Sequence, residues 1–184
     1  MITALKRGRP QKAVPAGTAW TITESGQWEV PATGQYQVEL HGGGGGAAFD
    51  FSGGQMPNYG ASGGGSGEVY TLSLVKGQKI QVVIGSGGAG NRNWTGYAGG
   101  ESSFGSVSIA GGGGGTCLSG TLVAGGAVGR LATSGTTVHA SLGAGGLGNK
   151  NKPNQTYGNG GNVFGGNYAN SGQPGAAIIT FLGA

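Results

Sequence analysis

Apolar and polar residues alternate along several short stretches of this chain. Between Gln35 and His41 the apolar residues Tyr36, Val38 and Leu40 occupy every second position, which is the period of a strand that buries one face. Related patterns predict further strands over Thr18–Thr23, Gln27–Pro31, Glu68–Val75, Lys79–Ile84 and Ala176–Leu182. The sequence therefore indicates short extended elements packed on one apolar core.

The pairing of two of these strands is suggested by the residues between them. Lys76-Gly77-Gln78 separates Glu68–Val75 from Lys79–Ile84, and a short glycine-containing connection of this kind predicts a β-hairpin. The last stretch is apolar on both faces, which predicts a central strand that closes the sheet made by the N-terminal half. Residues 17–184 are accordingly expected to form a single domain, with residues 1–16 as a leader.

Glycine makes up 47 of the 184 residues, against an ordinary share of roughly 7%. No stretch without glycine is longer than nine residues, so α-helices of ordinary length are not expected. Collagen is excluded as well, because the glycines come in runs with irregular gaps instead of at every third position.

The glycines gather in short pieces between segments of other composition. These pieces lie at 42–46, 60–67, 85–90, 96–100, 111–115, 125–129, 143–148, 158–161 and 165–166. Extended helices with three residues per turn have no internal hydrogen bonds, and only glycine lets neighbouring backbones approach closely enough to bond laterally. We therefore expect the pieces to pack on one another. Flexible linkers are the alternative, but linkers do not require nine separate glycine-rich pieces in one chain.

The positive charge of the chain belongs to its first residues. Four of the ten bases precede the first acid, and the remaining six balance the six acids. The four are Lys6, Arg7, Arg9 and Lys12. A leader of this kind could touch nucleic acid, but a neutral body argues against a phosphate-tracking surface. We interpret the leader as an attachment segment for a protein partner and expect no nucleic acid.

Motifs that resemble catalytic sites lack their required context. Residues 85–90 spell the GxGxxG pattern, but the residues that follow cannot form the helix of a dinucleotide site. Gly60–Gly64 spells GxSxG in a chain where glycine and serine are common. His41 and His139 have no patterned partners, and Cys117 is a single cysteine. We expect no enzyme, no metal and no cofactor.

The remaining chemistry lies in four inserts between glycine pieces, at 47–59, 91–97, 149–157 and 162–173, which hold eight of the 14 aromatic residues. They mix aromatic with small polar residues, a combination that binds partners at low entropic cost. The candidate binding residues are Phe49, Phe51, Met56, Tyr59, Arg92, Trp94, Tyr97, Lys150, Lys152, Tyr157, Phe164 and Tyr168. The alternative is that these aromatics only cap the ends of the glycine pieces against water.

The strand Gln35–His41 running into Gly42–Gly46, with aromatic and polar inserts between repeated glycine pieces, resembles the glycine-rich tail-fibre tip adhesins of bacteriophages. The resemblance covers residues 35–184. It implies an all-β fold in which short strands frame a sandwich of polyglycine-II helices with essentially no α-helix. It also implies that the inserts are loops that recognise an outer-membrane protein or a surface glycan of a bacterium.

On this basis the expected function is that of a receptor-binding adhesin at the phage tail tip, synthesised in the cytoplasm of the bacterial host. The leader would dock on a tail-fibre or baseplate protein. The chain would either cap a separate fibre or form a homotrimer. The alternative function is a structural cap or connector of the fibre or baseplate that binds no receptor.

Overall fold

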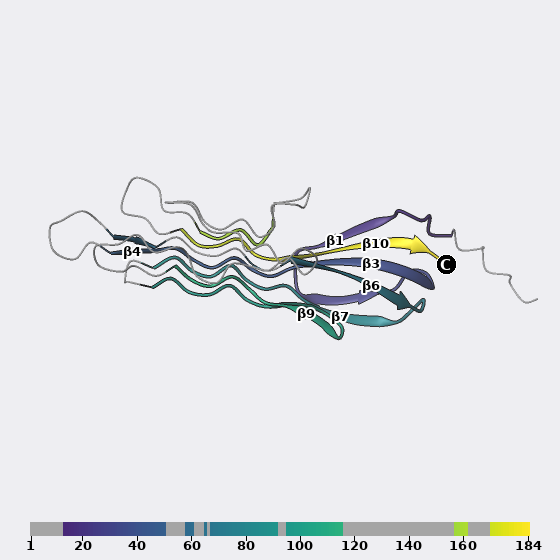
Figure 1. The fold of residues 1–184 in the computed structure, drawn as a ribbon. Helices are drawn as coiled ribbons and strands as arrows, with labels where there is room; N and C mark the ends of the chain where they lie inside the picture. The colour runs from purple at the N-terminus through teal and green to yellow at the C-terminus, as the bar shows by residue number, and fades with distance from the viewer. Residues whose placement is uncertain are drawn as a thin grey trace, which may run out of the picture.

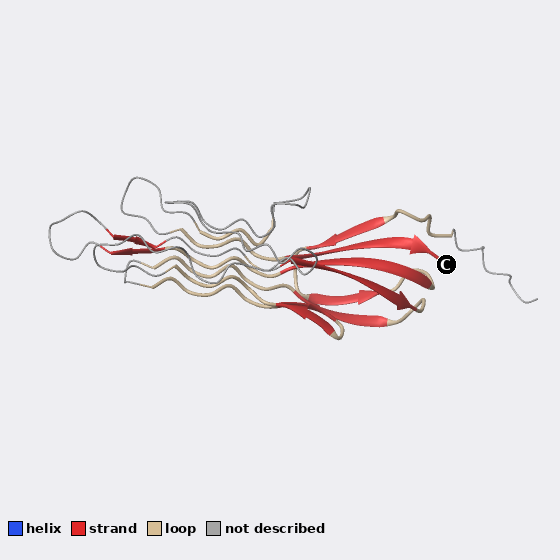
Figure 2. Ribbon diagram, viewed as in Figure 1, coloured by secondary structure: helices blue, strands red, loops and turns tan. Residues whose placement is uncertain are grey.

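The computed structural model describes residues 13–50, 58–60, 65, 67–91, 95–115, 157–161 and 170–184. Within them the chain has two parts placed end to end, a β-sandwich and a bundle of extended glycine-rich runs (Figure 1). Strands and irregular segments account for all of the described residues, and none of these residues is helical (Figure 2). The expected fold class is confirmed.

Two antiparallel four-stranded sheets make the sandwich. The first, which we call sheet 1, has the order β1-β10-β3-β6, and the second, sheet 2, has the order β2-β7-β8-β9. Sheet 1 consists of β1 (Ala19–Ile22), β10 (Ala176–Gly183), β3 (Gly34–His41) and β6 (Gly67–Leu74). Sheet 2 consists of β2 (Gly26–Glu29), β7 (Lys79–Val83), β8 (Ser102–Phe104) and β9 (Val107–Ile109).

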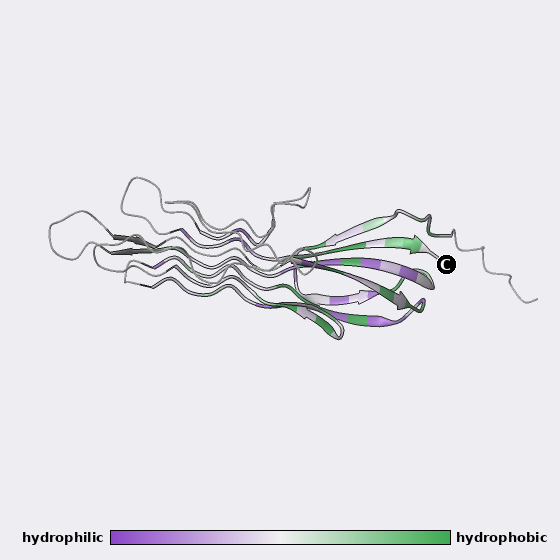
Figure 3. Ribbon diagram, in the orientation of Figure 1, coloured by the Kyte–Doolittle hydropathy of each residue, from purple (hydrophilic) through white to green (hydrophobic). Residues whose placement is uncertain are grey.

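The core lies between the sheets, where the alternation predicted it. Tyr36, Val38 and Leu40 of β3 are fully buried, and bands of apolar and polar residues alternate along the strands (Figure 3). Trp28 of β2 lies with its ring centroid 5.8 Å from that of Tyr36 and 5.7 Å from that of Phe104. Such edge-to-face and tilted aromatic contacts add to the stabilisation from apolar burial.

The prediction for the last strand is confirmed. β10 pairs antiparallel with β1 on one side and with β3 on the other. The C-terminal strand therefore occupies an interior position in the sheet, and its two faces differ as the sandwich requires. Ile179 and Phe181 enter the core, while Leu182 faces outward and is 47% exposed.

The predicted hairpin between β6 and β7 is wrong. β6 pairs with β3 in sheet 1, while β7 pairs with β2 in sheet 2, so the turn at Lys76–Gln78 crosses from one sheet to the other. The turn is held against Val30, the residue that follows β2. The Gly77 N–H donates to the Val30 carbonyl (2.8 Å), and the Val30 N–H donates to the Gln78 carbonyl (2.9 Å). Alternation shows which face of a strand is buried but not which strand lies beside it.

Strands β8 and β9 were not predicted from the sequence. They are three residues each and are joined by a tight turn at Gly105, whose φ is 60°. Ser102 and Phe104 are buried while Ser108 is exposed. The alternation is present in the sequence but is too short to be separated from the glycine-rich surroundings.

The glycine-rich bundle is centred on residues 42–47, which continue directly from β3 and which we call the central run. Runs 85–91, 110–115 and 158–161 lie parallel to it, as the paired registers of their hydrogen bonds show, and we call them the outgoing runs. Runs 95–100 and 170–175 lie antiparallel to it and are the returning runs. Gly65 lies against Gly42 on a further side.

Hydrogen bonding in the bundle follows these directions. Among the described residues, the N–H groups of the central run donate to the returning runs, as from Gly43 to the Gly100 carbonyl (3.0 Å). Its carbonyls accept from the outgoing runs, as Gly44 does from the Gly88 N–H (2.8 Å). Partners recur every three residues along each run, which is the repeat of a polyglycine-II helix. The predicted lateral packing of the glycine pieces is confirmed for these runs.

Close approach of backbones explains why the centre of the bundle is pure glycine. A Cβ added at any position from Gly42 to Gly46 would lie well inside 3.0 Å of a carbonyl oxygen in a neighbouring run. Successive positions face the runs 110–115, 85–91 and 158–161 in turn, so each of the five glycines has a neighbouring backbone where a Cβ would lie. A side chain anywhere in this stretch would push two hydrogen-bonded backbones apart.

The outer runs need fewer glycines. In run 95–100 the inward positions are Gly96 and Gly99, whose added Cβ atoms would meet carbonyls of the central run. Between them Tyr97 and Ala98 are exposed. Run 170–175 follows the same rule with Gly172 and Gly175 inward. Residues 170–173 of this run fall in the insert 162–173 predicted from the sequence, because glycines spaced three residues apart do not stand out as a glycine-rich piece.

Several predicted features lie outside the described residues. They are the leader bases, His139, Cys117 and the glycine pieces 125–129, 143–148 and 165–166. Within the described part of the chain, no helix has the length and hydropathy needed to cross a membrane.

The central run yields a stability prediction. We expect Gly45→Ala to lower the free energy of unfolding by about 3 kcal/mol, the upper part of the usual range for overpacking, because the new Cβ meets backbone and not a flexible side chain. Ala98→Ser, at an exposed position of a returning run, is the matched control and should change little. Denaturant unfolding followed by circular dichroism measures both, and equal midpoints would contradict a close-packed centre.

A second prediction concerns alkaline pH. Burial and the nearby Glu68 carboxylate, which accepts a 2.7 Å hydrogen bond from the phenol, raise the pKa of Tyr70 from 10.0 to about 12. Between these values the unfolded chain loses the proton first, so folding stability falls as the pH rises. In Tyr70→Phe this part of the alkaline loss should disappear. Thermal unfolding of both proteins across that pH range would show it as a shallower slope, and parallel slopes would contradict it.

Candidate functional site

The outgoing runs end, and the returning runs begin, at the end of the bundle that lies away from the sandwich (Figure 1). We call the described residues at this end the tip: 47–50, 58–60, 90–91, 95–97 and 170–171. The central run passes into β4 (Ala48–Asp50), which pairs antiparallel with β5 (Asn58–Gly60). A parallel bridge joins Ala48 to Asn91. Three of the four predicted inserts therefore contribute to one end of the molecule.

Hydrogen bonds tie these three parts of the tip together. The Ala47 N–H donates to the Asn170 carbonyl, and the Asn91 N–H donates to the Ala47 carbonyl, both at 2.9 Å. The Asn91 side chain donates through Nδ2 to the Thr95 carbonyl (2.9 Å), which joins the end of run 85–91 to the start of run 95–100. Segments that are far apart in the sequence are thus fixed relative to one another at the point where the bundle ends.

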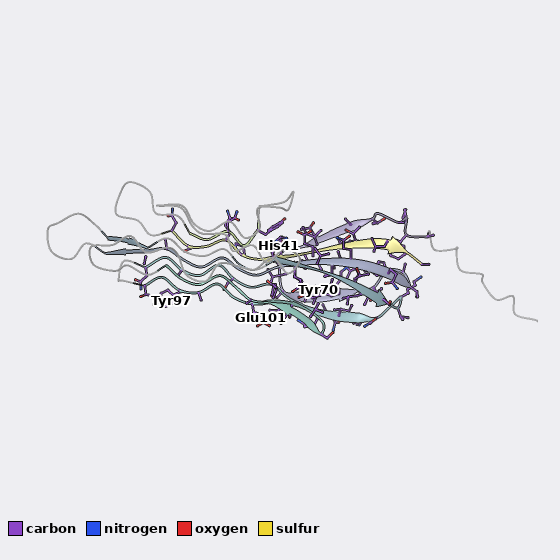
Figure 4. All side chains as sticks on the ribbon, in the orientation of Figure 1. His41, Tyr70, Tyr97 and Glu101 are labelled. Carbon is purple, nitrogen blue, oxygen red and sulfur yellow. The ribbon has the colours of Figure 1, made fainter. Side chains whose placement is uncertain are left out.

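Tyr97 is the predicted binding residue that the structure describes best. Its side chain is 62% exposed, and it lies toward the tip, whereas Glu101 and His41 lie where the bundle meets the sandwich (Figure 4). Its backbone is held on both sides, because its N–H donates to the Ala89 carbonyl (3.1 Å) and its carbonyl accepts from the Gly46 N–H (2.8 Å). The aromatic ring is therefore exposed, while the backbone that carries it is fixed by hydrogen bonds to two neighbouring runs.

The described neighbours of Tyr97 are small and uncharged. Ala98 follows it in the same run, Ala89 lies beside it in an outgoing run, and both are exposed. Gly114, on the third side, approaches its backbone. These described neighbours have small side chains or none, and the tyrosine ring, 62% exposed, is open to a ligand.

Tyr157 belongs to the opposite end of the bundle. It is half-buried, and its ring centroid lies 6.1 Å from that of His41 at the junction with the sandwich. His41 is 3% exposed, and its Nε2 lies 2.7 Å from Oε1 of Glu39. Tyr157, the last residue of the insert 149–157, therefore lies at the sandwich end of the bundle and not at the tip.

Phe49 and Tyr59 hold paired positions in the β4–β5 ladder. The other predicted binding residues lie outside the described part of the chain. They are Phe51, Met56, Arg92, Trp94, Lys150, Lys152, Phe164 and Tyr168. Sequence reasoning missed Asn91 and Ser171, which lie where a glycine-rich run meets the tip. Both side chains form hydrogen bonds to another run. The Asn91 amide bonds to Thr95, and the Ser171 hydroxyl accepts from the Gly90 N–H (3.3 Å).

The two buried polar residues of the described chain, His41 and Ser102, have structural partners. Ser102 is fully buried, and its hydroxyl accepts a hydrogen bond from the Gly85 N–H (2.9 Å) where β7 passes into its outgoing run. The described residues contain no group of three or more His, Cys, Asp or Glu side chains arranged to hold a metal. What the tip offers is exposed aromatic, amide and hydroxyl groups, which suit non-covalent recognition.

The chain also matches a known family, described as a glycine-rich domain, over residues 21–183. The match spans both the sandwich and the bundle. The chain belongs to this glycine-rich domain family. The description of the family agrees with the glycine-rich bundle of the structure. No curated protein matches the chain.

Proposed function

We propose that this glycine-rich domain protein is the tip adhesin of a bacteriophage tail fibre, and that its tip binds an outer-membrane protein or a surface glycan of the host bacterium. The observation that carries the proposal is the gathering of three aromatic and polar inserts at one end of a hydrogen-bonded bundle. A scaffold of this kind holds recognition loops away from the part of the molecule that attaches to its carrier.

The fixed backbone under Tyr97 supports a role in binding. A residue that is already ordered loses little conformational entropy when a ligand covers its ring, so more of the contact energy remains as affinity. The bonds that the Tyr97 backbone makes with Ala89 and Gly46 provide this order before any ligand arrives. The small neighbours leave the ring accessible.

The position of the N-terminal segment supports the other half of the proposal. The Gly17 N–H donates to the Phe181 carbonyl (2.7 Å) near the end of β10, so the described chain begins at the sandwich end (Figure 1). Leader bases Lys6, Arg7, Arg9 and Lys12 precede it. Attachment to a fibre or baseplate protein through this end would leave the tip pointing outward.

The first test is binding of the purified protein to host cells and to mutants that lack individual porins or the lipopolysaccharide glycan. We expect binding to wild-type cells and loss on one class of mutant, because the receptor is a single surface component. Equal binding to every strain, or binding to none, would contradict the adhesin and favour a structural role in the fibre.

A second prediction separates recognition from folding. We expect Tyr97→Ala to weaken cell binding about tenfold, as for a moderate interface hot spot, while the thermal transition is unchanged because the side chain is exposed. Trp94→Ala should act in the same direction. Val83→Ala, at an exposed position on the sandwich, is the control and should leave binding intact. A joint loss of binding and thermal stability in Tyr97→Ala would indicate a capping role for the ring.

A further inference from the structure

The outer face of sheet 1 is a second surface with a distinct chemistry. Strand alternation and register place on it the residues opposite to those buried in the core. We call this set the sheet 1 face. It consists of Ala19 and Thr21 from β1, Ile178, Thr180 and Leu182 from β10, Gln35, Gln37 and Glu39 from β3, and Val69, Thr71 and Ser73 from β6.

The sheet 1 face presents apolar side chains to solvent. Leu182 is 47% exposed, and Ile178 and Val69 are only half-buried. The register places Ile178 and Val69 in one row across the sheet, on either side of Glu39. A solvated face of an antiparallel sheet ordinarily carries polar residues at such positions, so a partner would cover these side chains with a gain in apolar burial.

The same face has almost no charge to oppose a partner. Its ionisable residues are Glu39 and, at the next outward position of β3, the buried His41, and the Glu39 carboxylate already lies 2.7 Å from the His41 ring. The other polar members are amides and hydroxyls. Gln35, for example, donates through Nε2 to the Ser73 hydroxyl (2.7 Å) within the face.

Amides and hydroxyls both donate and accept hydrogen bonds, so identical residues that meet across a symmetry axis can satisfy one another. Carboxylates or ammonium groups in the same places would repel their own copies. We propose that the sheet 1 face is covered by a second copy of this chain, packed face to face. The face is self-complementary in charge and in hydrogen bonding, which is the requirement for a contact between identical surfaces.

The outer face of sheet 2 shows the contrast. Glu29 and Lys79 are paired in register there, and both are exposed. That face keeps a charge of each sign in water, as is usual for a solvated surface. A charged partner would find groups to pair with on sheet 2 but not on the sheet 1 face. The proposal does not depend on receptor binding at the tip.

Sedimentation equilibrium of the full-length protein tests the proposal. We expect reversible self-association, and we expect Thr180→Lys, in the middle of the face, to weaken it at least about tenfold because like charges then oppose each other. Gln81→Lys, at an exposed position of β7, is the matched control and should associate as the wild type does. Circular dichroism and the fluorescence of Trp20 and Trp28 would verify that each variant is folded.

A charge-pairing experiment covers the case in which one substitution disturbs the strand. Thr180→Glu alone should also dissociate, whereas an equal mixture of the Lys and Glu variants should associate again. Two outcomes would overturn the proposal: a wild-type protein that stays monomeric over the accessible concentration range, or an oligomer that neither Thr180→Lys nor Thr180→Glu weakens relative to Gln81→Lys.

Discussion

The lateral hydrogen bonding of backbones without Cβ atoms governs this structure. An extended three-residue helix satisfies none of its own N–H and C=O groups, so the central run is stable only when other runs surround it. At Gly43 and Gly44 the bonds go to four different runs. The sandwich supplies the order of these runs, because β3 leads into the central run and β7 and β9 lead into outgoing runs, while the returning runs lead into β8 and β10. Bundle and sandwich therefore determine each other.

The sequence predicted which segments form strands better than it predicted which strands lie side by side. Alternation located β3, because one side of that strand is buried, and a stretch that is apolar on both faces located β10. Both are local properties of the sequence. Pairing is not local: β6 and β7 are adjacent in sequence, yet they lie in different sheets, and Leu74 and Ile80 reach the same core from these two sheets. Run 170–175 was not predicted for a related reason. Only the residues that face the neighbouring backbone must be glycine, so the run does not contain a continuous stretch of glycine.

The tip could be predicted only in part. Aromatic and polar inserts are visible in the sequence, but the end of the bundle at which each one lies depends on the direction of the runs that flank it. A glycine run reads the same in both directions. The hydrogen bonds of Gly43 and Gly46, and those of Gly44 and Ala47, taken in pairs, reveal the directions of the neighbouring runs. These directions place Tyr97 at the tip, while Tyr157 lies against His41 at the junction. Residues such as Asn91, which bond across the tip, have no signal beyond their place at the end of a run.

The two proposals are connected through the geometry of the bundle. The bundle and the sandwich lie end to end (Figure 1), so the sheet 1 face lies on the side of the molecule and leaves the tip free. If the symmetry axis between two copies runs along the bundle, both tips point the same way. Two weak sites would then act on one cell surface, and the second contact would form at high effective concentration. A modest affinity at Tyr97 would be enough for firm attachment, because the rigid bundles prevent the tips from moving apart.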